Sequence, residues 1–155
     1  MASVIVDVPG YRPIGLKNLV LDFTGTLSKD GVLLDGVDSR LKELSKAIQI
    51  AVLTADTFGT AAKALNGLPV ELKIIKSGKD KADYVHRVGA ASVAAIGNGR
   101  NDIPMCRVAA LSVAVMGPEG AASELIREAD VVVSDVRDGL DLLQNPLRLT
   151  ATLRD

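Results

Sequence analysis

Short apolar runs alternate with segments of helical spacing along almost the whole chain, and this alternation most constrains the fold. The runs are rich in Val, Ile, Leu and Ala, and short connections join them to the segments that follow. The predicted strands are 19–23, 48–53, 70–75, 91–96, 110–115 and 131–133. Such an alternation predicts an α/β fold: a doubly wound, mostly parallel, Rossmann-like sheet with right-handed crossovers.

The connections carry their own signals. Asp38 is the expected N-cap of a helix with apolar positions up to Ile48, and Asp30-Gly31 is a typical turn pair for a tight β-hairpin between Leu27 and Val32. A strand is expected over 3–8, with residues 11–16 leading into the central strand. The other predicted helices are 57–65, 79–88, 103–108, 119–128 and one that begins near residue 138.

Composition narrows the functional classes. The 155 residues predict a single domain, 1–155, and 18 Lys and Arg against 19 Asp and Glu disfavour a nucleic-acid partner. No apolar run is long enough to span a membrane, and the N-terminus lacks the pattern of a signal peptide, so we expect a cytoplasmic protein. Cys106 and His86 are each the single residue of their type, which disfavours a disulfide or a zinc site.

Polar side chains stand where several predicted strands end. Asp22 ends the central strand, Thr54 ends the next, and a cluster from Asn98 to Asp102 follows a third. Lysines occur between 76 and 81, after a fourth strand. The carboxyl ends of neighbouring parallel strands open onto one crevice, so we expect these groups to meet there. A carboxylate nucleophile, a hydroxyl, a lysine and a second acidic group are the parts that phosphoryl transfer requires.

Four segments together resemble the motifs of the haloacid dehalogenase superfamily of phosphatases. They are Asp22-Phe23-Thr24-Gly25-Thr26-Leu27-Ser28, Leu53-Thr54-Ala55-Asp56, Asp80-Lys81-Ala82 and Gly97-Asn98-Gly99-Arg100-Asn101-Asp102. Within the superfamily they look most like the phosphorylation domain of P-type cation ATPases, which reads Asp-Lys-Thr-Gly-Thr-Leu-Thr at its phosphorylated aspartate. The resemblance implies a Mg²⁺-dependent hydrolase, most simply a phosphatase that forms an aspartyl phosphate.

The resemblance also assigns roles. Asp22 would be the nucleophile and a metal ligand, and Thr24 would bind the metal through its backbone carbonyl. Thr54 and Lys81 would bind phosphate, with Lys76 and Lys79 as rivals of Lys81 for that part. The metal set would be completed by Asn98 and Asp102, the latter directly or through water.

Two positions depart from the family pattern. Phosphatases of the superfamily usually have a second aspartate two residues after the nucleophile, which acts as general acid and base, and this chain has Thr24 there. Because a threonine does not do this work near neutral pH, hydrolysis is expected to be slow. Asn98 replaces a metal-binding aspartate, which removes one negative charge and is expected to weaken metal binding.

Several alternatives stay open. The chain has no room between its first two motifs for an ATP-binding or cap domain, so an open crevice is expected. Such a crevice suits a large phosphorylated substrate, which would be a small molecule or a protein. Alternatively, another subunit of a homo-oligomer would cover the crevice. The hairpin at residues 32–34 would be a contact in that oligomer, or its leucines would pack on the body of the same chain. Alternative functions are a non-catalytic or regulatory phosphorylation-domain-like binding protein, and an oligomeric capless sugar-phosphate phosphatase.

Overall fold

The central element is a parallel sheet covered on both faces. The computed structural model describes residues 3–11, 13–56 and 59–155, and within these ranges the sheet has six strands in the order β10-β9-β8-β3-β6-β7, all parallel. The strands are β3 (Asn18–Asp22), β6 (Gln49–Thr54), β7 (Glu71–Ile74), β8 (Val93–Gly97), β9 (Leu111–Val115) and β10 (Val131–Val133). The prediction of a doubly wound parallel sheet is therefore confirmed.

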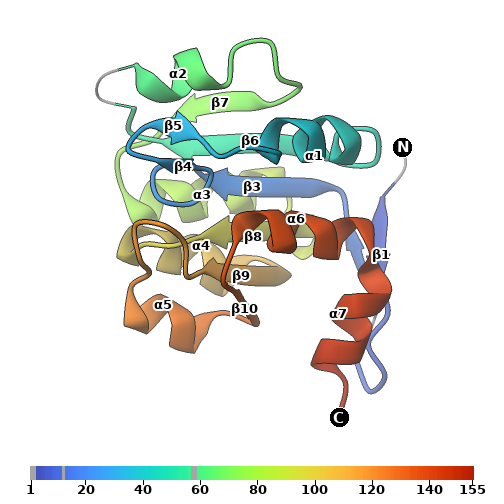
Figure 1. Cartoon of the computed structure of the whole chain (residues 1–155). Coiled ribbons are helices and arrows are strands. Elements are labelled where there is room, and N and C mark those ends of the chain that lie inside the picture. The colour runs from blue at the N-terminus through green and yellow to red at the C-terminus, as the bar shows by residue number, and fades with distance from the viewer. Residues whose placement is uncertain (1–2, 12, 57–58) are drawn as a thin grey trace.

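Helices form a layer on each face (Figure 1). One layer holds α1 (Val37–Leu44) and α6 (Val136–Gln144), and the other holds α3 (Gly78–Val88), α4 (Ile103–Val108) and α5 (Ser123–Glu128). The core is divided in the same way, because successive side chains of β3 point to opposite faces: Leu19 and Leu21 pack in one apolar cluster and Val20 in the other. No helix in the described ranges is long and apolar enough to cross a bilayer.

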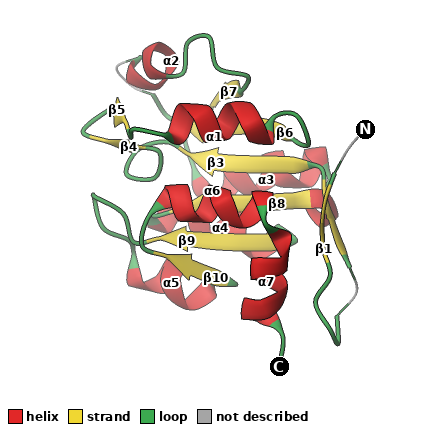
Figure 2. Ribbon diagram, turned by 45° about the vertical axis from the view of Figure 1, so that its right-hand side comes forward, coloured by secondary structure: helices red, strands yellow, loops and turns green. Residues whose placement is uncertain are grey.

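Smaller elements stand at the two ends of the strands (Figure 2). At the amino-terminal end, β1 (Val4–Val6) pairs antiparallel with β2 (Ile14–Leu16), beside α7 (Pro146–Leu153). At the carboxyl end, β4 (Ser28–Lys29) and β5 (Val32–Leu33) form the predicted hairpin. Its turn residues Asp30 and Gly31 both have positive φ, 51° and 81°, as a two-residue hairpin turn requires.

Two helix predictions are wrong in their ends, and a third describes two helices as one. Asp38 does not cap α1: the cap is Gly36, whose φ of 85° suits glycine, and Asp38 lies in the first turn. The helix also ends at Leu44, before Ala47 and Ile48.

α5 begins at Ser123 rather than 119, because a turn at 117–120 with Gly120 at φ 81° comes first. Instead of one last helix near 138 there are two, α6 and α7, divided at Asn145 where Pro146 begins the second. α2 (Thr60–Ala64) falls within the predicted 57–65, and residues 57 and 58 lie outside the described ranges.

Candidate active site

The chain turns sharply after β3 around one carbonyl group. The backbone oxygen of Phe23 accepts hydrogen bonds from the N–H groups of Thr26, Leu27 and Ser28 and from the Ser28 hydroxyl. Gly25 permits this turn because its φ is 75° and because a Cβ there would lie 2.5 Å from Nδ2 of Asn98. The 23–28 loop thereby brings its backbone against the end of β8.

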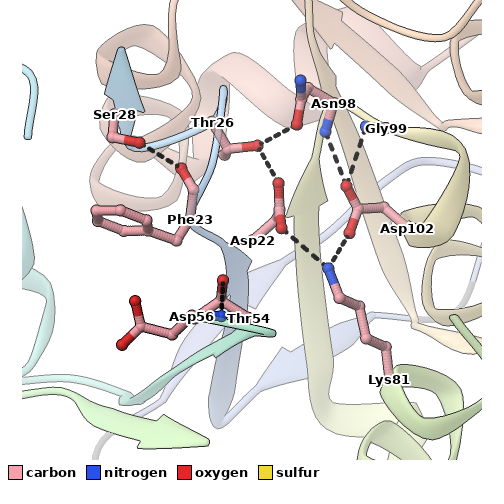
Figure 3. A network of polar contacts seen from close by, with 10 residues as sticks. All are labelled: Asp22, Phe23, Thr26, Ser28, Thr54, Asp56, Lys81, Asn98, Gly99 and Asp102. Atoms are coloured by element: carbon pink, nitrogen blue, oxygen red, sulfur yellow. Dashed lines mark hydrogen bonds and ion pairs between the residues drawn. The ribbon is translucent and has the colours of Figure 1, made fainter. Parts of the chain in front are cut away.

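A buried ion triad crosses the carboxyl ends of β3 and β8 (Figure 3). Nζ of Lys81, from α3, lies 2.9 Å from Oδ1 of Asp22 and 2.7 Å from Oδ1 of Asp102. Lys81 is 2% exposed and Asp102 is fully buried. Lys79 and Lys76 are exposed, and Lys79 pairs with Asp83 on its own helix. Of the three lysines considered, Lys81 is the one that reaches Asp22.

Asp102 is held on its other side by the loop in which it lies. Its Oδ2 accepts hydrogen bonds from the backbone N–H groups of Asn98 and Gly99, each at 3.0 Å. The approach depends on Gly97, where a Cβ would come 2.4 Å from Cγ of Asp102. Both oxygens of Asp102 are thus bonded to protein groups, so this side chain fixes Lys81 and the loop in place.

The surroundings of Asp22 shift the pKa of its carboxyl group. Burial raises the pKa of Asp22 to about 6, the nearby Asp102 carboxylate adds to the rise, and Lys81 partly offsets it. Burial alone lowers the pKa of Lys81, but the two carboxylates together outweigh that effect and raise it. Lys81 therefore carries a proton at neutral pH, and Asp22 is mostly ionised there.

Thr26 joins Asp22 to Asn98, and sequence reasoning assigned it no role. Its fully buried hydroxyl lies 3.1 Å from Oδ2 of Asp22 and 3.0 Å from Oδ1 of Asn98. A hydroxyl has one proton, so it donates to one of these oxygens at a time, and the other keeps a free lone pair.

The end of β6 has a more local structure. Oγ1 of Thr54 accepts a hydrogen bond of 3.3 Å from the backbone N–H of Asp56. The Asp56 carboxylate in turn accepts from the N–H groups of Ala61 and Ala62 at the start of α2, with its own φ at 42°. Thr54 is 6% exposed and donates its proton to none of the described residues, so this proton is available to a ligand.

Thr24 and the metal donors complete the arrangement. Thr24 is exposed, two residues beyond Asp22. The described residues contain no group of three or more His, Cys, Asp or Glu side chains suited to a metal ion. Oxygens of Asp22 and Asn98 nevertheless converge on Thr26, and such carboxylate and amide oxygens are ligands that Mg²⁺ accepts.

Comparison with known proteins places this site in a family. The model of the haloacid dehalogenase-like hydrolases matches residues 21–139, which include Asp22, Thr54, Lys81 and Asp102. The chain belongs to this family of hydrolases. An uncharacterized protein of Methanocaldococcus jannaschii is 51% identical over 63 residues, covering 41% of this chain and 68% of the relative.

Solved structures share the fold. The cobalt-bound deoxy-D-mannose-octulosonate 8-phosphate phosphatase of Haemophilus influenzae has a TM-score of 0.71 and 19% identity, covering 88% of this chain and 91% of that one. The 3-deoxy-D-manno-octulosonate 8-phosphate phosphatase of Moraxella catarrhalis, in complex with magnesium, phosphate and a sugar-acid molecule, has a TM-score of 0.70 and 16% identity, covering 88% and 90%. The expected special likeness to cation ATPases stays a prediction.

Proposed function

We propose that this hydrolase is a Mg²⁺-dependent phosphatase that acts through an aspartyl phosphate on Asp22. The observation that carries the proposal is the carboxylate of Asp22 at the end of β3, with the ammonium of Lys81 held 2.9 Å away by Asp102. A nucleophile beside a fixed cation suits attack on a phosphate, because the cation offsets the repulsion between two anions.

The reaction divides into two displacements. An Asp22 oxygen forms a bond to phosphorus as the bond to the leaving oxygen breaks, and water then attacks the same phosphorus and releases Asp22 and inorganic phosphate. Lys81 and the Thr54 hydroxyl would bind the non-bridging oxygens. Thr26 would orient Asp22 through its hydrogen bond.

Magnesium suits the oxygens present. Asp22, the carbonyl of Thr24 and Asn98 would hold the ion, with Asp102 supporting the loop from behind. The bound ion would supply positive charge to the phosphate and to Asp22. The solved relatives with the same fold hold cobalt or magnesium, which supports this choice.

Thr24 is expected to slow both displacements. The position lacks the carboxyl group that would protonate the leaving oxygen and activate water, a loss that typically costs about 10²- to 10⁴-fold in rate. Two outcomes are open: a long-lived aspartyl phosphate, as in the cation ATPases that the motifs resemble, or an enzyme that is simply slow. The substrate would be a phosphorylated small molecule or protein, and the neighbouring sugar-acid phosphatases support the first. We place the reaction in the cytoplasm.

Incubation with acetyl phosphate or para-nitrophenyl phosphate tests the proposal, with and without Mg²⁺. We expect metal-dependent product release, or a phosphate adduct in the intact mass that is absent from Asp22→Asn. Neither signal at high enzyme and metal concentration would overturn the catalytic proposal. A binding domain for a phosphorylated partner would then be the better account, and that partner should still bind Asp22→Asn.

A further inference from the structure

Asn98 is bonded on every side, although the family pattern has an aspartate there. Its backbone N–H donates to Asp102, and its backbone oxygen accepts from Ala122 at 2.8 Å. In the side chain, Oδ1 faces Thr26, while Nδ2 donates to the backbone oxygen of Gly120 at 3.1 Å. One residue thus connects the ion triad to the connection between β9 and α5.

The chemistry of its neighbours fixes the orientation of this amide. A backbone carbonyl oxygen only accepts hydrogen bonds, so the NH₂ group of Asn98 must face Gly120. The amide oxygen then faces Thr26 and Asp22. An aspartate at this position would set a negative oxygen against the Gly120 carbonyl and lose the donor, so an amide suits this position better than a carboxylate.

The segment that Asn98 holds, residues 116–122, borders the nucleophile loop. A Cβ at Gly117 would lie 3.1 Å from the backbone oxygen of Gly25, and Glu119 accepts a hydrogen bond of 3.0 Å from the N–H of Asp30 in the hairpin turn. We call residues 116–122 the wall loop. It stands between the 23–28 loop, the hairpin and the end of β8.

Backbone and side-chain hydrogen bonds together hold the wall loop, which also has an internal turn from Gly120 N–H to the Gly117 oxygen. Its ends are held by backbone bonds, from Met116 N–H to Val133 and from Ala122 N–H to Asn98. Between them, Nδ2 of Asn98 bonds the loop to the site, and the carboxylate of Glu119 bonds it to the hairpin. Both bonds are exposed to water, and the bond to Glu119 has a charged acceptor.

We propose that Asn98 is a positioning residue that fixes the wall loop against the nucleophile loop, and that its amide is adapted to this purpose. This rests on the proposed function only where it concerns turnover. Replacing Asn98 by the aspartate of the family pattern would add a charge for Mg²⁺ and release the loop. In this variant the affinity for Mg²⁺ should therefore rise, while the wall loop should become less ordered.

Hydrogen–deuterium exchange of the full chain tests the structural part. In Asn98→Asp, and also in the uncharged Asn98→Ala, the backbone amides of the wall loop should exchange about fivefold faster or more, while β3 and β8 stay protected. The matched control is Asn145→Asp. It removes the same kind of bond, from Nδ2 to a backbone oxygen at 2.9 Å, at the distant junction of α6 and α7.

Titration with Mg²⁺ alone, followed by thermal shift, and kinetics with para-nitrophenyl phosphate complete the test. Asn98→Asp should bind Mg²⁺ more tightly than wild type, yet show a KM raised more than kcat is lowered. Unchanged exchange in the wall loop of both Asn98 variants, or an equal rise across the whole sheet, would overturn the proposal. If wild type shows neither turnover nor a phosphate adduct, the phosphatase proposal fails, and the exchange data still decide the role of Asn98.

Discussion

The ends of β3 and β8 are joined by charged side chains from three elements, whereas the end of β6 is bonded within its own connection. On the first side, Asp22, Lys81 and Asp102 form two ion pairs that fix one another. On the second, Thr54 and Asp56 bond to the backbone that follows them. The first side is a network of mutually bonded charges, and the second has a hydroxyl whose proton is not donated to any described residue.

The two sides should therefore differ in how substitutions affect the stability of the fold and the binding of substrate. Residues of the triad should affect both the free energy of unfolding and turnover, because they are buried and mutually satisfied. Thr54 should affect turnover with little effect on stability. Each prediction below changes one side and compares it with a matched position elsewhere.

Lys81→Met should have the largest effect. It leaves two buried carboxylates without their cation, and breaking a buried ion pair by removing one partner typically costs about 3–5 kcal/mol. Urea unfolding and turnover both report on it. The control is Lys79→Met, two residues earlier on the exposed side of α3, where the pair with Asp83 is in water and no measurable change is expected. If the two variants are equally stable, the buried triad does not stabilise the fold, and the contrast between the ends of β3 and β8 and the end of β6 has no basis.

The second-largest expected effect is the pH dependence of stability that Asp22 causes. Because its pKa in the folded protein is raised to about 6, the folded state binds more protons than the unfolded state between pH 4 and pH 6. Its contribution to stability therefore falls as pH rises through this window, by up to about 3 kcal/mol. Metal-free unfolding of wild type and Asp22→Asn should show it as a difference in slope that disappears in the variant.

Gly97→Ala should destabilise by about 1–3 kcal/mol, because its methyl group would displace Asp102 from Lys81 and from the loop amides. Gly15→Ala in β2 is the matched control, with nothing within 4 Å of the added Cβ. Thermal unfolding of the two variants measures the effect. If Gly97→Ala is as stable as Gly15→Ala, the added methyl group does not displace Asp102, and the close approach at Gly97 does not constrain the site.

Much of this arrangement was predictable from local patterns, and the rest depends on distant contacts. Asp22 and Thr54 at strand ends follow from apolar runs that stop at a polar residue, and the hairpin follows from Asp30-Gly31. Helix starts were less predictable, because Gly36 caps α1 by its backbone conformation alone.

The bonds of Asn98 and Thr26 join residues 22 and 72 positions apart in sequence. No local sequence pattern predicts these two hydrogen bonds. That is why Asn98 was interpreted as a weakened ligand and Thr26 received no role.

The last comparison sets two buried threonines against each other. Thr26→Val removes a donor shared by Asp22 and Asn98 and should cost about 1–2 kcal/mol in stability, because buried acceptors lose their partner. Thr54→Val removes one long acceptor contact to Asp56 and should cost less than about 0.5 kcal/mol. Turnover should not follow this order: Thr54→Val loses a donor to the phosphate and should lower kcat/KM by about a hundredfold. Denaturant unfolding and steady-state kinetics on the same two proteins separate the effects. If Thr54→Val is unstable and active, or Thr26→Val is fully stable, the two sides of the site are not divided between a fixed frame and a binding group.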